Sequence, residues 1–180
     1  MRYSLADTET YLHTLERRVS SAVVAIYTDT GTVLVVKAYY KDYWSFPGGI
    51  VDGDETPRDA AVREVEEETG VRLDPDSLKF VMVVDRISRI AQTYQFVFEV
   101  KVDSSILQAI SLDGDEITGY EIVTREAILA GNLVYSQTTH AWAKGITGYQ
   151  EQMFKRGGIE LGDDTESSID SAQPDQAASH

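Results

Sequence analysis

Three glutamates, Glu64, Glu67 and Glu68, are spaced so that one turn of an α-helix would place their carboxylates side by side. With about 100° of rotation per residue and Glu64 at zero, Glu67 lies at about −60° and Glu68 at about +40°. The apolar residues Ala61 and Val65 fall beside Glu68, so the carboxylates border the face that packs on the core. Taken alone, such a row could be a solvated helix surface. At the edge of a core, however, the crowding favours a hard divalent cation such as Mg²⁺.

Arg63 and Glu55 are placed to support these carboxylates. Arg63 comes four residues before Glu67 and eight after Glu55, so its planar guanidinium could hold and orient a carboxylate through paired hydrogen bonds. Residues 49–70 contain eight acidic residues against two arginines, within a chain whose net charge is −14. An internal segment this acidic indicates a site for a cation.

These residues belong to a longer pattern, Gly49-x5-Glu55-x7-Arg63-Glu64-Val65-Glu66-Glu67-Glu68-Thr69-Gly70-Val71. The segment Trp44-x-Phe46-Pro47-Gly48-Gly49 leads into it, and Asp115-Glu116-Ile117 comes later, before a predicted strand. The first pattern resembles the box of the Nudix hydrolase family. The other two segments are similar to this family as well, and the resemblance covers roughly residues 18–155.

The resemblance implies an α/β fold, an α/β/α sandwich with a mixed β-sheet, and attack of water on a phosphoanhydride with Mg²⁺ or Mn²⁺ as cofactor. The substrates it implies are nucleoside diphosphates linked to a further group X. By motif position it assigns the metal site to Glu64, Glu67 and Glu68, to which we add Gly48. It assigns supporting roles to Glu55, Arg63, Gly49 and Gly70, and we also count Arg63 among the catalytic residues.

The proton acceptor for water is expected among the same acids. Our first choice is Glu67, and Glu64 is counted as catalytic with it. Some members of the family use a glutamate from a later loop, for which Glu116 is the candidate, with Glu99 behind it. Glu116 could equally be a solvated acid in a turn.

The class of substrate is inferred only by elimination, from residues that other subfamilies carry after the box and this chain lacks. ADP-ribose pyrophosphatases of this family tend to carry a proline about sixteen residues after the box, where this chain has Ile87, and diadenosine polyphosphate hydrolases tend to carry a tyrosine there. We therefore expect a MutT-like enzyme acting on a nucleoside triphosphate. ADP-ribose, nucleotide-sugar or dinucleotide pyrophosphatases, and a non-catalytic nucleotide sensor, stay open. Candidate substrate-binding residues, each also suited to a core or rim position, are Arg18, Trp44, Phe46, Tyr94 and Asn132.

Composition excludes several other classes of protein. The 180 residues include no cysteine, which excludes a disulfide scaffold, a thiol nucleophile and a Cys-ligated zinc site. The acidic charge argues against binding to nucleic acid. The longest apolar run, residues 22–27, is too short for a membrane span, and no signal-peptide core precedes it. We expect a cytoplasmic protein with a small-molecule nucleotide-type substrate and no membrane partner, and a homodimer stays open because family members often dimerise.

The elements that must position these residues are predicted from apolar periodicity and turn residues. Thr56 and Pro57 begin the best-marked helix and Gly70 ends it, while Pro47-Gly48-Gly49 is expected to break regular structure before it. Strands are predicted over residues 19–27, 32–38, 78–85, 91–102 and 117–123, and helices over 8–17, 57–69, 126–130 and 135–155. The expected organisation is an N-terminal helix (1–17), a Nudix domain (18–156) and a disordered acidic tail (157–180).

Overall fold

The protein is described by a computed structural model that covers residues 4–87, 91–112 and 114–153. The expected acidic tail lies outside these residues. The helices are α1 (Leu5–His13), α2 (Pro57–Thr69), α3 (Arg125–Ala130) and α4 (Gln137–Ala143), with 3-10 turns at Pro75–Ser77 and Ile106–Gln108. The strands are β1 (Val19–Thr28), β2 (Thr32–Ala38), β3 (Gly48–Ile50), β4 (Lys79–Ile87), β5 (Gln92–Val102), β6 (Ile117–Thr124) and β7 (Gly148–Met153).

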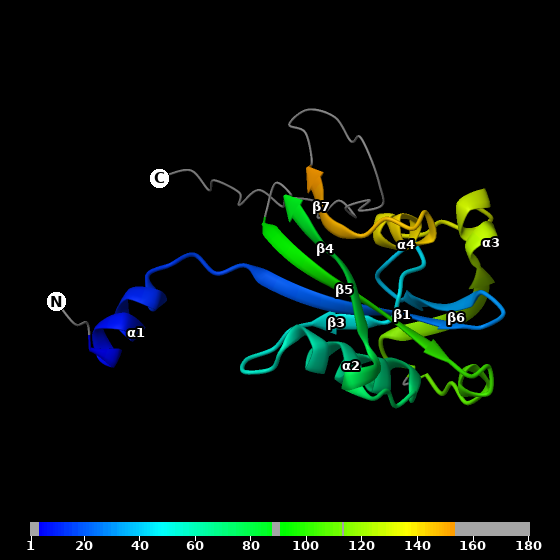
Figure 1. Cartoon of the computed structure of the whole chain (residues 1–180), viewed down its shortest axis with the longest axis horizontal. Helices are drawn as coiled ribbons and strands as arrows, with labels where there is room; N and C mark the ends of the chain where they lie inside the picture. The colour runs from blue at the N-terminus through cyan, green and yellow to red at the C-terminus, as the bar shows by residue number, and fades with distance from the viewer. Residues whose placement is uncertain (1–3, 88–90, 113, 154–180) are drawn as a thin grey trace, which may run out of the picture.

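Within the described residues, seven strands form one mixed sheet in the order β6-β2-β1-β5-β4-β7, with β3 paired to β1 beside β2. The pairs β1–β5 and β4–β7 are parallel, and the other pairs are antiparallel. Helix α2 covers one face of the sheet, and α3 with α4 covers the other (Figure 1). This arrangement confirms the expected α/β/α sandwich.

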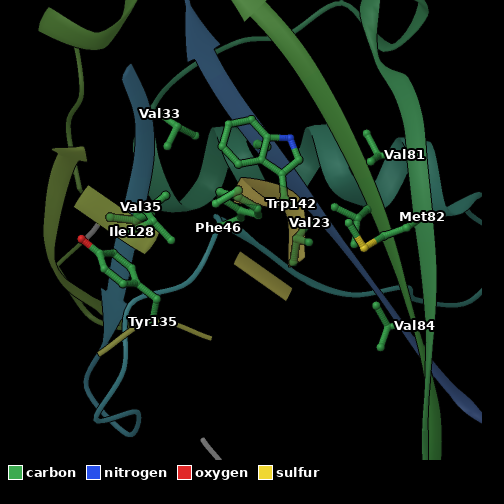
Figure 2. Close-up of a cluster of buried hydrophobic side chains, with 13 residues drawn as sticks. Val23, Val33, Val35, Phe46, Val81, Met82, Val84, Ile128, Tyr135 and Trp142 are labelled. Carbon is green, nitrogen blue, oxygen red and sulfur yellow. The ribbon is translucent and has the colours of Figure 1, made fainter. Parts of the chain in front are cut away.

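Trp142 on α4 is the largest buried side chain on its face of the sheet. Its ring meets that of Phe46 edge-to-face at 5.4 Å between centroids, and its Nε1 donates a hydrogen bond to Glu99 Oε2 at 3.0 Å. Figure 2 shows the indole between Val33 on one side and Val81 with Met82 on the other. Burial of such a ring stabilises the fold by roughly 1.5–3 kcal/mol, so α4 is fixed firmly to this face.

Helix α2 begins and ends at the predicted residues. The Thr56 hydroxyl accepts a hydrogen bond from the backbone N–H of Asp59, and Gly70 ends the helix in the left-handed conformation with φ of +70°. Ala60, Ala61 and Val65 are fully buried against the sheet. The face turned towards the sheet is therefore the one predicted from the apolar spacing.

The Gly48-Gly49 pair does not break regular structure as expected, because both residues belong to β3. Gly48 lies opposite Val23 of β1, and Gly49 opposite Ala22. A Cβ at Gly48, where φ is +137°, would lie 2.1 Å from the backbone oxygen of Ala22. The absence of a side chain here permits a close approach of two strands. In the sequence alone, glycines used in this way cannot be distinguished from the glycines of a turn.

The prediction of one long helix over residues 135–155 is wrong. Helix α4 is seven residues long, and Gly145 and Gly148 follow with φ of +74° and +80°. The chain then enters β7, which pairs in parallel with β4. The two glycines three residues apart allow the change of direction, and the long-range pairing with β4 outweighs the helical periodicity.

The first helix also differs from its prediction. It begins at Leu5, with Ser4 as N-cap. Ser4 and Asp7, the third residue of the helix, form a capping box in which each side chain accepts a hydrogen bond from the other residue's backbone N–H. Its apolar residues Tyr11 and Leu12 are exposed, as is Leu15 beyond its C-terminal end. Figure 1 shows α1 standing away from the sheet. Within the described residues no helix is both long and apolar enough to cross a bilayer.

Candidate active site

The three glutamates of α2 lie in three different environments. Glu68 is buried, and its Oε2 accepts a hydrogen bond from the backbone N–H of Gly48 at 2.8 Å. The side chain of Glu64 is 17% exposed, whereas that of Glu67 is 59% exposed. This gradient is the one that the helical angles predicted, with Glu68 nearest to the apolar face.

Arg63 connects these acids to each other and to β3. Its Nε and Nη2 donate to the two carboxylate oxygens of Glu55 at 3.1 and 2.8 Å. Its Nη1 donates to Glu64 Oε1 at 2.9 Å and to Glu67 Oε2 at 3.0 Å, and Nη2 also reaches the carbonyl oxygen of Ile50 at 3.1 Å. One guanidinium therefore fixes three carboxylates against the strand.

Glu55 is held in turn by its own loop. The backbone N–H of Asp52 donates to Glu55 Oε1 at 2.8 Å. The hydrogen bonds from Arg63, and then that from Asp52, lower the pKa of Glu55 below its ordinary value. The hydrogen bonds that Arg63 donates to Glu55 also raise the pKa of Arg63, so this pair stays ionised across the working range of pH.

The carboxylates nearest to β3 are electrostatically strained. Burial raises the pKa of Glu68 to about 8, against the opposing hydrogen bond from Gly48 and the charge of Lys41. Burial likewise raises the pKa of Glu64, although the Arg63 contacts lower it. Glu116 adds a further negative charge that raises both values. A group of buried, mutually repelling carboxylates is stabilised by a cation placed among them.

The donor chemistry of this group fits a hard divalent ion, since all its side-chain donors are carboxylate oxygens. Gly49 supplies the space: a Cβ on it would lie 2.5 Å from Cδ of Glu64. In the part of the chain that the structure describes, no three acidic or histidine side chains are arranged to hold an ion as they stand. Because Arg63 holds Glu64 and Glu67, a metal ion would have to draw these carboxylates away from it.

Glu116 lies near this group, whereas Glu99 does not. The Tyr40 hydroxyl donates to Glu116 Oε1 at 2.7 Å, and burial together with this contact raises the pKa of Tyr40. Glu99 on β5 instead accepts hydrogen bonds from Trp142 and from Lys79. Of the two later glutamates that the sequence offered as proton acceptors, Glu116 lies at the site and Glu99 does not.

A pocket of about 290 Å³ opens beside the carboxylates. Its walls come from β1, β3, β4 and β5, from residues 40–46 and from the segments that carry Glu116 and Ser136. Glu64, Gly48 and Gly49 line it together with Glu116. Glu67 and Arg63 line a neighbouring hollow instead. The carboxylate group thus lies at the boundary between two surface depressions.

Among the predicted substrate-binding residues, Phe46 lines the pocket and the other four do not. Trp44 packs against the Trp142 side of the core, and Asn132 is exposed between α3 and α4. The guanidinium of Arg18 lies 6.0 Å from the ring centroid of Tyr94. Tyr94 shares a face of β5 with Phe96 and Phe98, on the α2 side of the sheet, because strand side chains alternate.

Sequence reasoning missed the polar wall of the pocket, which contains Ser21, Arg86 and Gln95. A signal for it was present in the strands. Ser21 lies two residues before Val23, and Gln95 two residues before Val97, so each pair shares one face of its strand. Each polar residue therefore occupies a position on a face that is otherwise apolar. Arg86 follows Met82 and Val84 in the same way on β4. Which of these positions share one pocket depends on the strand order, which the sequence alone does not give.

Comparisons with known proteins agree with this fold. The model of the NUDIX domain matches residues 16–141. A MutT-like protein from Streptomyces ambofaciens is 42% identical over 60 residues, which are 33% of this chain and 38% of that protein. The match to this curated relative therefore spans well under half of its length.

Two solved structures show the same fold. The MutT NUDIX hydrolase from Burkholderia pseudomallei aligns with a TM-score of 0.59 and 22% identity, over 73% of this chain and 100% of that one. The NUDIX domain of Shewanella oneidensis NrtR, complexed with ADP ribose, aligns with a TM-score of 0.63 and 15% identity, over 79% and 97%. Since the domain model also spans well over half of the chain, this protein belongs to the NUDIX domain family.

Proposed function

We propose that this protein is a pyrophosphohydrolase that uses a divalent metal ion to cleave a phosphoanhydride bond in a nucleoside diphosphate linked to a group X. The observation that carries the proposal is the group formed by Glu64 and Glu116 in the wall of the pocket and by the buried Glu68 beside them. An acidic wall repels a polyanionic substrate unless metal ions lie between the two. The site therefore fits a phosphate-bearing substrate only as a metal complex.

Nudix hydrolases generally use divalent metal ions, and we propose Mg²⁺ or Mn²⁺ here. Glu64, Glu67 and Glu68 would hold the ion, with the carbonyl oxygen of Gly48 as a further donor. The bound ion would supply neutralisation of the phosphate charge and a lowered pKa for water. Arg63, fixed by Glu55, holds the Glu64 and Glu67 carboxylates in the positions from which they would bind the ion.

The proton of the attacking water needs an acceptor within reach of the pocket. Glu116 lines the pocket together with Glu64, and its carboxylate is oriented by the Tyr40 hydroxyl. Glu67, the first choice from the sequence, bonds Arg63 and faces the neighbouring hollow. These contacts favour Glu116 as the base and leave Glu67 as a metal ligand, an assignment that paired variants can separate.

Within this reaction class we propose a nucleoside triphosphate as the substrate. The pocket lies near the lower end of the range for small-molecule sites, which is roughly 300–1,000 Å³, and Tyr40, Tyr43 and Phe46 offer rings for a base to contact. The match to a MutT-like protein supports the same class. ADP-ribose, nucleotide sugars and dinucleotides stay as alternatives. ADP-ribose is among them also because the NUDIX domain of NrtR is complexed with it.

The alternative of a binding module without turnover has one argument against it. Sensing of a ligand needs the pocket, but it does not need the arrangement in which Arg63 bonds Glu55, Glu64 and Glu67 together. We propose, further, action on a free small molecule in the cytoplasm, with no nucleic acid or membrane partner. The domain boundaries at residues 17/18 and 156/157 stay predictions, and so does the assembly of the protein into a homodimer.

The test is product identification with the full chain, incubated with Mg²⁺ or Mn²⁺ and a panel of nucleoside triphosphates, nucleotide sugars, ADP-ribose and dinucleotides. We expect release of nucleoside monophosphate with pyrophosphate, or of diphosphate with phosphate, and no release in EDTA. A Glu64→Gln variant should be inactive. The control is Glu66→Gln, on the same helix but bonded to Arg72 outside the site. No product from any compound with either ion would leave the binding module as the better explanation.

A further inference from the structure

Arg86 is a cation in the wall of the pocket whose described neighbours leave its charge uncompensated. Its Nε donates to Gln152 Oε1 at 3.1 Å, and its Nη2 donates to Gln95 Oε1 at 3.0 Å and to Thr138 Oγ1 at 2.9 Å. All three acceptors are neutral. Among the residues that the structure describes, Arg86 forms no ion pair, and its Nη1 donates no hydrogen bond to them.

The neighbouring hydrogen bonds also orient the amide of Gln95. Its Oε1 accepts from Arg86 and from the Thr138 hydroxyl, the latter at 2.7 Å, so both lone pairs of that oxygen are used. Thr138 is 2% exposed, which fixes this arrangement between β4, β5 and α4. The Gln95 NH2 group is left on the side away from Arg86. Both residues line the pocket, and among the described residues Nη1 of Arg86 and Nε2 of Gln95 are donors without an acceptor.

This donor wall lies across the pocket from the carboxylates. Arg86 is on β4, and Glu64 contacts Gly49 of β3. Strands β1 and β5 lie between them in the sheet, and adjacent strands are about 4.8 Å apart. The guanidinium reaches back over β5 to Gln95, which leaves a span of roughly 10 Å to the carboxylates. The same pocket thus has an acidic end and a cationic end, and among the described residues no ion pair joins the two.

We propose that Arg86, assisted by Gln95, binds a phosphate group of the substrate distant from the metal-binding carboxylates. The inference rests on the proposed function for the identity of the substrate. A guanidinium held by neutral acceptors keeps its full charge for a ligand, and its planar donors match phosphate oxygens. The phosphate could be the terminal group of a polyphosphate chain or a phosphate carried by X. Arg86 is then a specificity-determining residue that selects substrates with this group.

The direct test does not depend on turnover. Isothermal titration calorimetry in Mg²⁺ would measure binding of inorganic tripolyphosphate, as its metal complex, to the wild type, Arg86→Gln and Arg72→Gln. The last is the control, because it removes an equal charge from an exposed arginine outside the pocket. Loss of a charged hydrogen bond should weaken binding about tenfold or more in Arg86→Gln, and Arg72→Gln should match the wild type. Equal affinities in all three proteins would overturn the proposal.

Arg86 also joins β4 to β7 and α4, so its variant could fold poorly. For this reason the second measurement uses the wild type, in which NMR would follow the arginine Nε–H resonances during addition of tripolyphosphate in Mg²⁺, with Arg86 assigned through Arg86→Lys. The Arg86 resonance should shift and the Arg72 resonance should not. An Arg86 resonance of the wild type that does not move at saturation would overturn the proposal, and only the charge-conserving Arg86→Lys variant has to fold, for the assignment.

Kinetics then distinguish the two sources of the phosphate. With a substrate from the panel, Arg86→Gln should raise KM about tenfold while kcat changes little. If the group is the terminal phosphate, this rise should disappear for the shorter nucleoside diphosphate. If X carries it, the rise should follow X at constant chain length. Unchanged KM for every substrate would overturn the role of Arg86, whereas absence of turnover would contradict only the proposed function.

Discussion

A side chain at Gly49 would occupy the space that the Glu64 carboxylate fills. A Cβ built on Gly49 lies 2.5 Å from Cδ and 2.6 Å from both carboxylate oxygens of Glu64. Glu64 reaches from α2 to this strand, where its Oε1 also accepts a hydrogen bond from Arg63. The bare backbone of β3 thereby sets the position of a proposed metal ligand that is fifteen residues later in the chain.

Gly49→Ala should lower kcat/KM by about 10²-fold, the size of effect expected when a reacting group is displaced by about 1 Å. The fold should tolerate the change, because the obstructing atoms are the far end of a flexible side chain. We expect the melting temperature to stay within about 4 °C of the wild type. Steady-state kinetics and thermal unfolding of the same preparation measure both quantities.

The neighbouring Gly48→Ala variant is the matched comparison. Its Cβ would meet the backbone oxygen of Ala22 at 2.1 Å, from a φ of +137° that other residues rarely adopt. Since backbone atoms cannot rotate away, this variant should lose about 3 kcal/mol of unfolding free energy. If Gly49→Ala kept wild-type rates, or were as unstable as Gly48→Ala, the role of the contact with Glu64 would be contradicted.

Glu116→Gln and Glu67→Gln should fail in different ways. Loss of the base lowers kcat by about 10²–10⁴-fold, so Glu116→Gln should have this effect with an unchanged Mg²⁺ requirement. Loss of a ligand should instead raise the Mg²⁺ concentration for half-maximal rate in Glu67→Gln. Metal titrations of the rate, with Glu66→Gln as control, separate the two. Near wild-type rates in Glu116→Gln would return the role of base to Glu67.

Helix α2 and the inward position of Glu68 could be predicted because their causes are local. Thr56 and Gly70 mark the two ends through hydrogen bonds and a left-handed φ within one turn of the helix. The angle between Glu68 and Val65 follows from helical geometry alone. A hydrogen bond from Gly48 then completes the burial of Glu68.

Strand β7 and the polar pocket wall could not be predicted because their causes are distant in sequence. Residues 148–153 form a strand by pairing with β4, more than sixty residues earlier. Arg86 meets Thr138 and Gln152 only once β7 and α4 are in place. Local periodicity contains no information on which strands are neighbours, so the cationic end of the pocket became visible only in the structure.

Glu55 and Arg63 should behave as one unit. Glu55→Gln and Arg63→Lys each disrupt the paired hydrogen bonds, and each should lower kcat/KM by about 10–100-fold, as is usual for residues that orient metal ligands. The double variant should lose little more than the worse single variant, because residues in one network are not additive. A double-mutant cycle on kcat/KM measures the coupling. Fully additive losses would show that the pair does not act through one arrangement.

The metal-free protein should lose stability as pH rises, and Glu68 is the reason. Its pKa is about 8 in the folded protein against an ordinary value of 4.5, so the folded state keeps a proton that the unfolded state releases between these values. The free energy of unfolding must then fall as pH rises from about 4.5 to about 8. Glu64, whose pKa is also raised, contributes in the same direction.

A divalent ion should reverse this loss, because it favours the ionised carboxylates. In EDTA, the melting temperature of the wild type should fall more between about pH 5 and about pH 8 than that of Glu68→Gln, which has no proton to lose at this position. Addition of Mg²⁺ should raise the wild-type melting temperature more at about pH 8 than at about pH 5, since metal binding competes with the proton. Parallel pH profiles for the two proteins in EDTA would show that Glu68 does not carry the buried proton. An Mg²⁺ effect independent of pH would place the ion away from these carboxylates.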